Sequence, residues 1–259
     1  ETIDREVWNT RNNAGILDAS TLGKIDIKGQ DSKKFLNMIY TNDWRLVKKG
    51  QCKYGIMLKE DGMILDDGVT SCINENHFHM TTTTSGAPAV LSWMEEWIQT
   101  EWPNMDVTLT SVTEQWSVIS IAGPKSKQIL SELDCGIDLN PESFPFMTFK
   151  NASIEDIPVR IFRISFTGEL SYEVNVPSSF GLYIWQKILK IGEKFSLMPY
   201  GTEAMHVLRA EKGFIIIGQE TDGSVSVSDI GMDWIVSKKK HDFIGKRSLP
   251  IINSKKNRK

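Results

Sequence analysis

Two adjacent carboxylates, Asp66 and Asp67, are the residues of this sequence whose type and position most directly suggest chemistry. An Asp61-Gly62 turn leads into the apolar run 63–65, and that run stops at the two carboxylates. Because successive side chains of a strand point to opposite faces, one carboxylate should face inward and the other should face solvent. An inward carboxylate is costly unless a partner or a ligand compensates it. The pair therefore predicts a site at the end of this strand.

Polar residues of two further strands could contribute to such a site. The four threonines Thr81–Thr84 follow an expected strand, and they form either its solvated end or a hydroxyl-lined wall of a polar pocket. Glu173 lies on another strand beside Tyr172, and alternation turns these two side chains to opposite faces. Taken alone, Glu173 would most often be a surface carboxylate.

Arg209 is the cation whose geometry suits recognition of a carboxylate. Its planar guanidinium can bind a carboxylate through two parallel hydrogen bonds. It could equally be a structural residue, because charge networks near helix ends are common. The candidate structural partners are the acidic residues that follow it, Glu211, Glu220 and Asp222.

Several classes of site are disfavoured by the motifs. His77 and His79 share a strand face, but no cysteine or carboxylate stands beside them at ligand spacing, so we predict a polar face and no metal. The sequence contains no P-loop, no Gly-x-Gly-x-x-Gly and no Gly-x-Ser-x-Gly motif. It therefore carries no dinucleotide fingerprint of its own.

Length and composition are those of an ordinary globular protein. The 259 residues are 40% hydrophobic and 24% charged, and the net charge of −3 gives no support for nucleic-acid binding. No apolar run approaches the roughly 18–20 residues that span a bilayer. Cys52, Cys72 and Cys135 have no CxxC spacing and fit reduced thiols, which predicts a cytoplasmic location. The chain begins with Glu1 and looks like a piece of something longer.

Hydrophobic periodicity predicts hairpins with helices interspersed between them. The expected strands are 24–28, 54–58, 63–72, 77–82, 116–122, 159–165 and 170–176. The expected helices begin near residues 4, 31, 91, 125, 179 and 202. Because strands and helices do not alternate strictly, the pattern predicts an α+β fold with mostly antiparallel sheets and flanking helices.

A repeated pattern predicts two similar, closely packed subdomains. A strand, a turn that contains glycine with Asp or Pro close after it, and a helix occur at 25–40 and again at 117–133. We therefore expect a first subdomain at 1–112 and a second at 113–250. The basic, polar residues 251–259 are expected to be a disordered tail.

A set of ordered motifs identifies a family. They are Gly15–Ser20, Tyr40–Asp43, Tyr54–Asp67, Ala122–Pro124, Phe166–Glu173, Arg209–Glu211, Ile217–Gln219 and Phe243–Lys246. With them the chain resembles the folate-binding aminomethyltransferase family, which includes the glycine-cleavage T-protein. Four segments narrow the resemblance to the C-terminal folate domain of the α subunit of heterotetrameric sarcosine oxidases: Asp18–Asp26, Met80–Thr84, Gln99–Trp102 and Pro199–Arg209. Phe166 stands where T-proteins carry a tyrosine.

The resemblance implies roles for particular residues. Asp67 matches the essential carboxylate of the family, which leaves Asp66 as a solvated or turn-stabilising group. Glu173 matches the residue that recognises the pterin ring, whose 2-amino group and N3–H can both donate to one carboxylate. The remaining expected folate contacts are Leu22, Tyr54, Thr82, Thr83, Phe166 and Arg209.

The resemblance also implies an activity. A tetrahydrofolate-binding enzyme domain would capture the one-carbon unit of an oxidised N-methyl amine, sarcosine, as 5,10-methylenetetrahydrofolate. Flavin (FAD or FMN) and NAD would belong to the parent complex, and the partners would be other sarcosine oxidase subunits or flavin-bearing segments. The alternatives are a stand-alone T-protein-like aminomethyltransferase or demethylase, and a scaffold module with a degenerate folate site. The C-terminal β-barrel domain of the family is expected to be absent.

Overall fold

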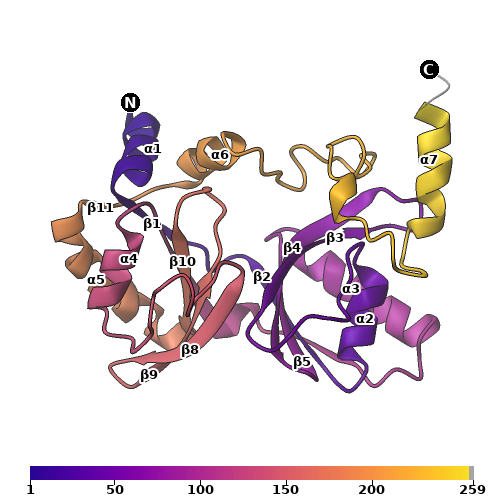
Figure 1. Cartoon of the computed structure of the whole chain (residues 1–259), viewed down its shortest axis with the longest axis horizontal. Coiled ribbons are helices and arrows are strands. Elements are labelled where there is room, and N and C mark those ends of the chain that lie inside the picture. Colours follow the sequence, from indigo (N-terminus) through magenta and orange to yellow (C-terminus); the bar gives the residue numbers. More distant parts are fainter. Residues whose placement is uncertain (257–259) are drawn as a thin grey trace. The chain divides into compact units, whose positions relative to one another are not determined.

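Residues 1–256, which a computed structural model describes, form two compact units (Figure 1). The first unit contains residues 1–21 and 113–215, and the second contains 22–112 and the chain from residue 216 onward. Each unit has its own mostly antiparallel β-sheet with flanking helices. The predicted α+β fold class is confirmed.

The first unit is built on a six-stranded sheet in the order β11-β1-β7-β10-β9-β8. Its strands are β1 (Ala14–Asp18), β7 (Trp116–Ala122), β8 (Thr148–Ile154), β9 (Ile157–Arg163), β10 (Ser171–Pro177) and β11 (Leu197–Pro199). Neighbouring strands are antiparallel except β1 and β11, which are parallel. Short 3-10 turns lie at Thr113–Gln115, Ser178–Phe180 and Glu193–Phe195.

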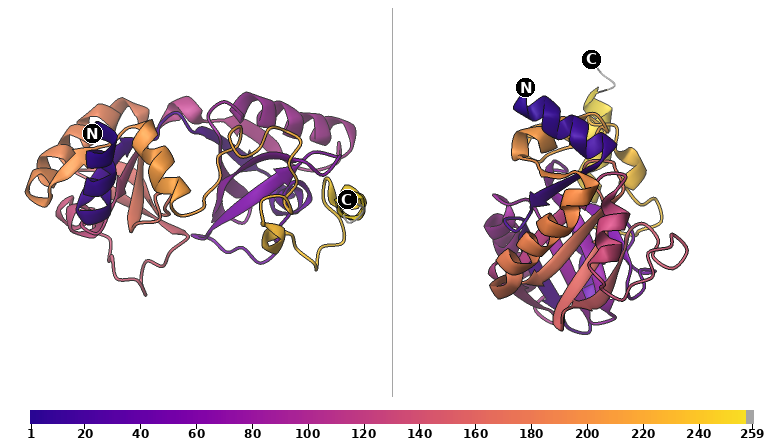
Figure 2. Two further views of the ribbon diagram at one scale, coloured as in Figure 1. Left: turned by 90° about the horizontal axis from the view of Figure 1, so that it is seen from above. Right: turned by 90° about the vertical axis from the view of Figure 1, so that its left-hand side faces the viewer.

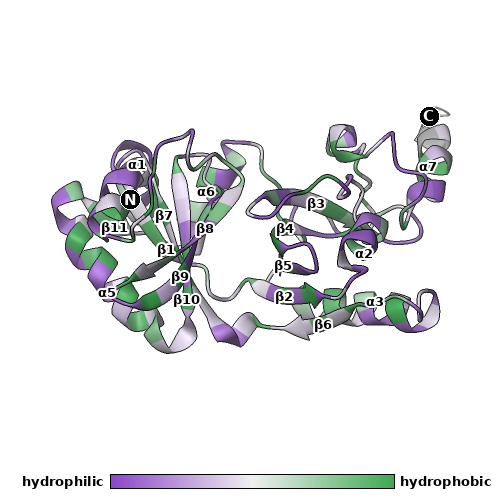
Figure 3. Cartoon of the chain, turned by 60° about the horizontal axis from the view of Figure 1, so that its bottom comes forward, coloured by the Kyte–Doolittle hydropathy of each residue, from purple (hydrophilic) through white to green (hydrophobic). Residues whose placement is uncertain are grey.

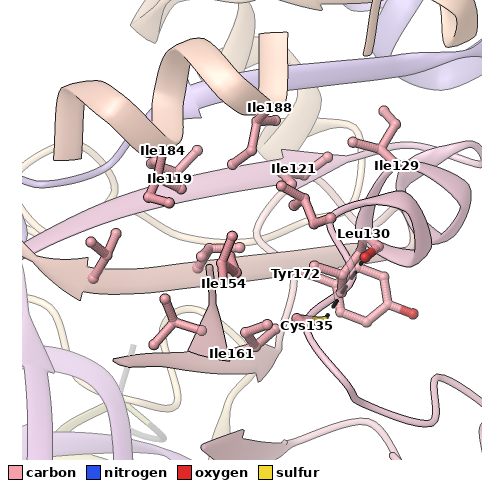
Figure 4. Packing of buried hydrophobic residues seen from close by; sticks show 14 of the residues in the cluster. Ile119, Ile121, Ile129, Leu130, Cys135, Ile154, Ile161, Tyr172, Ile184 and Ile188 are labelled. Carbon is pink, nitrogen blue, oxygen red and sulfur yellow. Dashed lines mark hydrogen bonds between the residues drawn. The ribbon is translucent and has the colours of Figure 1, made fainter. Parts of the chain in front are cut away.

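Helices cover both faces of this sheet. On one face, α4 (Ser126–Glu132) and α5 (Gly181–Gly192) pack against alternate strand residues, and Figure 4 shows Ile184 and Ile188 of α5 directed toward the strands. On the other face, α1 (Thr2–Asn12) and α6 (Thr202–Ala210) lie side by side (Figure 2). There Leu17 packs beside a small apolar cluster around Tyr200.

The second unit is built on an antiparallel sheet in the order β3-β4-β5-β2-β6. Its strands are β2 (Gly23–Lys28), β3 (Cys52–Leu58), β4 (Ile64–Asn74), β5 (His77–Thr82) and β6 (Thr108–Ser111). Its helices are α2 (Ser32–Ile39), α3 (Ala87–Thr100) and α7 (Leu249–Lys256), with 3-10 turns at Asp233–Ile235 and Lys246–Ser248. No helix within residues 1–256 is long and apolar enough to cross a membrane.

Two apolar clusters cover the two faces of the β3–β4 hairpin. Met57 belongs to the cluster that α2 and α3 complete, whereas Ile56 belongs to a cluster with residues of the segment 225–249. Alternation along the strand accounts for this division, since adjacent side chains point to opposite faces. Helix α3 contributes Val90 and Met94 to the Met57 cluster, and Figure 3 shows that this helix carries both apolar and hydrophilic residues. The hairpin is therefore buried on both sides.

The composition of the units differs from the predicted subdomains 1–112 and 113–250. The chain does change units between residues 112 and 113, but the first 21 residues join the first unit and the chain from 216 joins the second. Strand β1, which periodicity did not predict, explains the first difference because it pairs with β7 and β11. The pairing partners lie more than 100 residues away, so no local pattern reports them.

The expected disordered tail also differs from the structure. Residues 251–256 continue helix α7, and residues 257–259 lie outside the described part of the chain. The start of the helix is fixed against the turn of the β3–β4 hairpin. The Ser248 hydroxyl donates to the Glu60 carbonyl, and Ile252 packs against Gly62. These contacts explain why a polar, basic segment is ordered there.

The repeated strand–glycine–helix pattern occurs in both units. Gly29 connects β2 to α2, and Gly123 connects β7 to α4, with φ angles of +129° and +120°. A Cβ at Gly29 would lie 2.0 Å from the Asp106 carbonyl oxygen, and one at Gly123 would lie 2.6 Å from that of Thr10. Positive φ and close backbone approach together require glycine at both turns.

A buried lysine attaches the C-terminal segment to the second unit. Lys240 is 3% exposed, and its ammonium donates to the carbonyls of Tyr40 and Asn42. It also lies 4.7 Å from the centre of the Phe243 ring. Burial lowers the pKa of Lys240, so these interactions have to offset its desolvation.

Replacement of this lysine by Lys240→Met should lower the free energy of unfolding by about 1–3 kcal/mol. The variant leaves two buried carbonyls without their donor, and an unsatisfied buried acceptor costs that much. Urea denaturation measures the change. The matched control is Lys239→Met at the exposed neighbouring position, which should stay within about 0.5 kcal/mol of wild type. Equal effects of the two substitutions would contradict the role given to Lys240.

Candidate functional site

A β-bulge decides which face of the second sheet each of the two adjacent carboxylates takes. Leu58 pairs with Ile64 and Met57 pairs with Asp66, so β4 has one extra residue, Leu65. Asp66 then shares the face of Met57. Asp67 lies opposite Ile56, on the other face.

Asp67 forms a close pair with a tyrosine of the neighbouring strand. The Tyr54 hydroxyl donates to Asp67 Oδ2 at 2.6 Å, and both side chains are half-buried. Burial raises the pKa of Asp67 to about 7, and the negative charge of Asp66 adds to this rise. The Tyr54 hydrogen bond acts in the opposite direction, because it stabilises the ionised carboxylate.

Asp66 is not the solvated residue that the sequence suggested. It is 1% exposed, and its carboxylate accepts from the backbone N–H of Asp67 at 2.8 Å and from the Thr83 hydroxyl at 3.1 Å. Burial raises the pKa of Asp66 to about 6, while the hydrogen bonds from Asp67 and Thr83 limit the rise. The solvated alternative was wrong because helix α3 and the turn before it cover this face of the strand, whereas the bond to Thr83 agrees with the turn-stabilising alternative.

The two carboxylates together can perform acid–base chemistry near neutral pH. Like charges in adjacent buried positions resist simultaneous ionisation, so the pair holds a proton at a higher pH than isolated aspartates do. A general base is most effective when its pKa lies near the working pH. Asp67 has such a pKa and remains partly accessible, which makes it the candidate base.

The threonines at the end of β5 and directly after it form hydrogen bonds within the second unit. Thr81 bonds to the backbone of Val69, and Thr82 is 2% exposed and donates to the Thr83 carbonyl. Thr83 contacts Asp66 and so lies beside the carboxylate pair. Leu22, half-buried at the start of the second unit, accepts from Lys24 through its carbonyl. Folate contacts of Leu22, Thr82 and Thr83 stay predictions.

Glu173 lies on the face of the first sheet that α4 and α5 do not cover. It pairs with Ser120 of β7 and Phe162 of β9, while its neighbour Tyr172 points into the core. The buried ring of Tyr200 is close, because the Glu173 charge contributes to the raised pKa of that phenol. A half-buried carboxylate beside aromatic rings suits a planar ligand with two adjacent donors.

Phe166 and Arg209 both meet Phe214, a residue that the sequence analysis did not select. The rings of Phe166 and Phe214 stack with centroids 6.2 Å apart and an interplanar angle of 14°. Arg209, which is 6% exposed, donates to the Phe214 carbonyl at 2.9 Å. Arg209 therefore holds the turn after α6 that presents the ring of Phe214 to Phe166.

A cavity of about 300 Å³ lies in the same part of the first unit. Aromatic and polar side chains line it together, among them Phe146, Arg163, Ser165, Glu169 and Phe214. The volume is at the lower end of small-molecule pockets. The Phe166–Glu173 motif thus contributes to a concave surface as well as to a strand.

Arg11 positions this motif and was missed by the sequence analysis. Its guanidinium donates to the Thr167 carbonyl and the Glu169 carboxylate, and also to the Leu208 carbonyl and the Glu211 carboxylate. One side chain of α1 thereby joins the 166–169 loop to α6. Glu211, considered above as a partner of Arg209, pairs with Arg11 at 2.8 Å. The contacts span more than 150 residues, so no local signal reveals them.

The two histidines of β5 bind an aspartate that the sequence analysis did not connect with them. Both ring nitrogens, His77 Nε2 and His79 Nδ1, lie 2.8 Å from the Asp26 carboxylate of the adjacent strand β2. These bonds hold the pKa of Asp26 well below its usual range, although burial acts against them. Among residues 1–256, no cluster of three His, Cys, Asp or Glu side chains could hold a metal ion.

Comparison with known proteins identifies the family. Residues 1–240 match the GCVT N-terminal domain, and the chain belongs to this family. The sarcosine oxidase subunit alpha of Corynebacterium sp. (strain P-1) is 53% identical over 248 residues, which are 95% of this chain and 26% of that protein. The chain thus spans about a quarter of the length of this relative.

Aminomethyltransferases are the second group of relatives. That of Halothermothrix orenii is 30% identical over 248 residues, which cover 96% of this chain and 67% of that protein. The crystal structure of glycine cleavage system aminomethyltransferase T from Bartonella henselae shares the fold, with a TM-score of 0.86 at 23% identity. The match covers 98% of this chain and 66% of that one. The predicted family resemblance is confirmed, and the chain is an aminomethyltransferase-like domain related to sarcosine oxidase alpha subunits.

The buried charge of Asp67 should make stability depend on pH. Its folded-state pKa of about 7 exceeds the unfolded value of 3.8, so the folded protein binds more protons between these values. Stability from this group therefore falls as the pH rises from about 4 to 7. Asp67→Asn removes the charge but keeps an acceptor for Tyr54, and it should raise the free energy of unfolding at pH 8 by on the order of 1–3 kcal/mol.

Urea denaturation at pH 8 and at pH 4 tests this expectation. The gain should be largest at pH 8 and close to zero at pH 4, where the wild-type carboxyl is largely protonated. Asp61→Asn, which removes a charge from the exposed turn of the same hairpin, is the matched control. If the Asp67→Asn protein were less stable than wild type at pH 8, the expectation that the Asp67 charge lowers the free energy of unfolding would be contradicted.

Loss of the Arg11 guanidinium should destabilise the first unit. Arg11→Met leaves the Thr167 and Leu208 carbonyls without these bonds and the Glu169 carboxylate without this cation, which should cost about 2–4 kcal/mol. Arg5→Met, at an exposed position of the same helix, is the control. Thermal and urea denaturation should separate the two variants, and near-identical curves would rule out the positioning role of Arg11.

Proposed function

We propose that this chain is the tetrahydrofolate-binding one-carbon transfer domain of a sarcosine oxidase alpha subunit. In this role it captures the one-carbon unit of oxidised sarcosine as 5,10-methylenetetrahydrofolate. The observation that carries the proposal is the half-buried Asp67, whose pKa is raised and which accepts from Tyr54, within a segment that matches the family. The 53% identity to a sarcosine oxidase subunit alpha supports the choice of oxidase.

The residues present fit a reduced folate chemically. A pterin offers a 2-amino group and an N3–H side by side, and the half-buried Glu173 carboxylate can accept both. The stacked Phe166 and Phe214 provide aromatic surface for the rest of such a ligand. Tetrahydrofolate supplies the nucleophilic nitrogen that takes up the one-carbon unit, so the protein need not provide a nucleophile.

The protein supplies charge and a proton acceptor. An ionised Asp67 stabilises the positive charge of the incoming iminium carbon unit, and this carboxylate can accept a proton when the new carbon–nitrogen bond forms. Tyr54 holds the carboxylate in one orientation through its 2.6 Å hydrogen bond. Oxidation of the N-methyl amine requires a flavin, which in this proposal another part of the oxidase complex provides, together with its NAD.

A stand-alone aminomethyltransferase is the second candidate function. It is favoured by the 30% identity to such an enzyme over 67% of that protein's length. Co-purification of a flavin-bearing partner distinguishes the two activities, because only the oxidase requires it. A scaffold module with a degenerate folate site is the remaining alternative, and a failure of tetrahydrofolate to bind would favour it.

Two substitutions should separate binding from transfer. Glu173→Gln should weaken tetrahydrofolate binding by roughly tenfold or more, because one acceptor oxygen and the charge are lost. Asp67→Asn should bind tetrahydrofolate but yield no methylenetetrahydrofolate in the assembled oxidase. Calorimetry measures the first effect and product analysis the second. Glu142→Gln, at an exposed loop position, is the control for Glu173→Gln. A normal yield of methylenetetrahydrofolate from Asp67→Asn would overturn the role of Asp67.

A further inference from the structure

Asp66 is a buried acidic group to which the proposed reaction gives no role. It is 1% exposed, which is rare for an aspartate unless hydrogen bonds compensate its burial. An apolar residue of similar size would fill the position at lower cost in free energy. The contacts of the carboxylate therefore indicate what it does.

The Asp66 carboxylate joins the backbone of Asp67 to the turn that precedes α3. Oδ1 accepts from the Asp67 N–H at 2.8 Å, and Oδ2 accepts from the Thr83 hydroxyl at 3.1 Å. The carboxylate therefore supplies an acceptor for a strand N–H and a fixed contact to the turn before α3.

The start of helix α3 is shaped to admit this carboxylate. Gly86 is the N-cap residue of the helix, and a Cβ there would lie 2.5 Å from Asp66 Oδ2. Such a contact is too short for any other residue, so glycine lets the carboxylate reach the helix end. The partial positive charge of a helix N-terminus favours an ionised carboxylate there.

We propose that Asp66 is the positioning residue of the Asp67 site: its ionised carboxylate, held between the Asp67 backbone N–H and the Thr83 hydroxyl, fixes the backbone of Asp67 and places a negative charge beside the Asp67 carboxylate. The inference deepens the proposed function and rests on it for its catalytic meaning. The two neighbours then have separate tasks. Asp66 holds a charge between a bulge and a helix end, and Asp67 takes and releases the proton.

The electrostatic surroundings of Asp67 support this division. Tyr54 of β3 and Asp66 beside it are the ionisable groups that act on the Asp67 carboxyl, the first by a hydrogen bond and the second by repulsion. Tyr40, at the end of α2, lies within electrostatic reach of both carboxylates and is neutral because burial raises its pKa. Removal of the Asp66 charge should therefore lower the proton affinity of Asp67 directly.

A pH titration followed by carbon-13 NMR, on the 259-residue chain with labelled aspartate carboxyl groups, tests the proposal without folate. The Asp67 carboxyl signal is assigned by its loss in Asp67→Asn. In Asp66→Asn, which keeps an acceptor oxygen but no charge, the pKa of Asp67 should fall by about one pH unit, the scale of a close like-charge effect. In the assembled oxidase, the acidic limb of the pH–rate profile for methylene transfer should move to lower pH by the same amount. An unchanged pKa of Asp67 overturns the proposal.

Asp66→Glu separates position from charge and serves if the asparagine variant does not fold. It keeps the negative charge but displaces the carboxylate by one methylene. The pKa of Asp67 should stay raised, while the Asp67 amide proton should lose the downfield shift of a charge-assisted hydrogen bond. An unchanged amide signal would contradict the positioning role. Asp61→Asn, in the exposed hairpin turn, should change neither signal.

These measurements distinguish the inference from the proposed function. The NMR signals report on Asp66 and Asp67 in the free chain, so they answer whether the carboxylates are coupled even if tetrahydrofolate does not bind. Absence of tetrahydrofolate binding by the wild-type chain would instead refute the proposed function and leave the coupling intact.

Discussion

The bulge at Leu65 is the local irregularity on which the candidate site depends. Without it, Asp66 and Ile64 would share one face of β4, and Asp67 would point toward the α2 and α3 side. With it, Asp67 joins the face of Ile56 and meets Tyr54, while Asp66 turns toward the start of α3. One extra residue thus decides which of the two neighbouring carboxylates meets Tyr54 and which meets the start of α3.

The free-energy cost of burying these two carboxylates is offset by packing that lies outside the site. Both pKa values are raised mainly by burial, so at neutral pH the pair lowers the stability of the second unit. The apolar clusters on both faces of the hairpin act in the opposite direction. Functional sites commonly retain such destabilising groups where the surrounding packing holds them in place.

Sequence reasoning succeeded where the information was local. Periodicity predicted the β3–β4 hairpin and α3, and motif order identified the family. It failed for Asp66 because alternation assumes a regular strand and says nothing about what covers each face. It also missed Arg11 and Asp26, whose partners lie on other elements and, for Arg11, more than 150 residues away.

By itself the sequence determined the fold class, most helices and strands, the family and the candidate residues. These follow from short-range patterns of apolar residues, glycines and motifs, which any folded form of the chain must satisfy. Only the tertiary structure decided that residues 1–21 belong with 113–215 and that Asp66 is buried as well as Asp67. Pairing between distant strands and burial by a distant helix end depend on the path of the whole chain, and no local pattern encodes them.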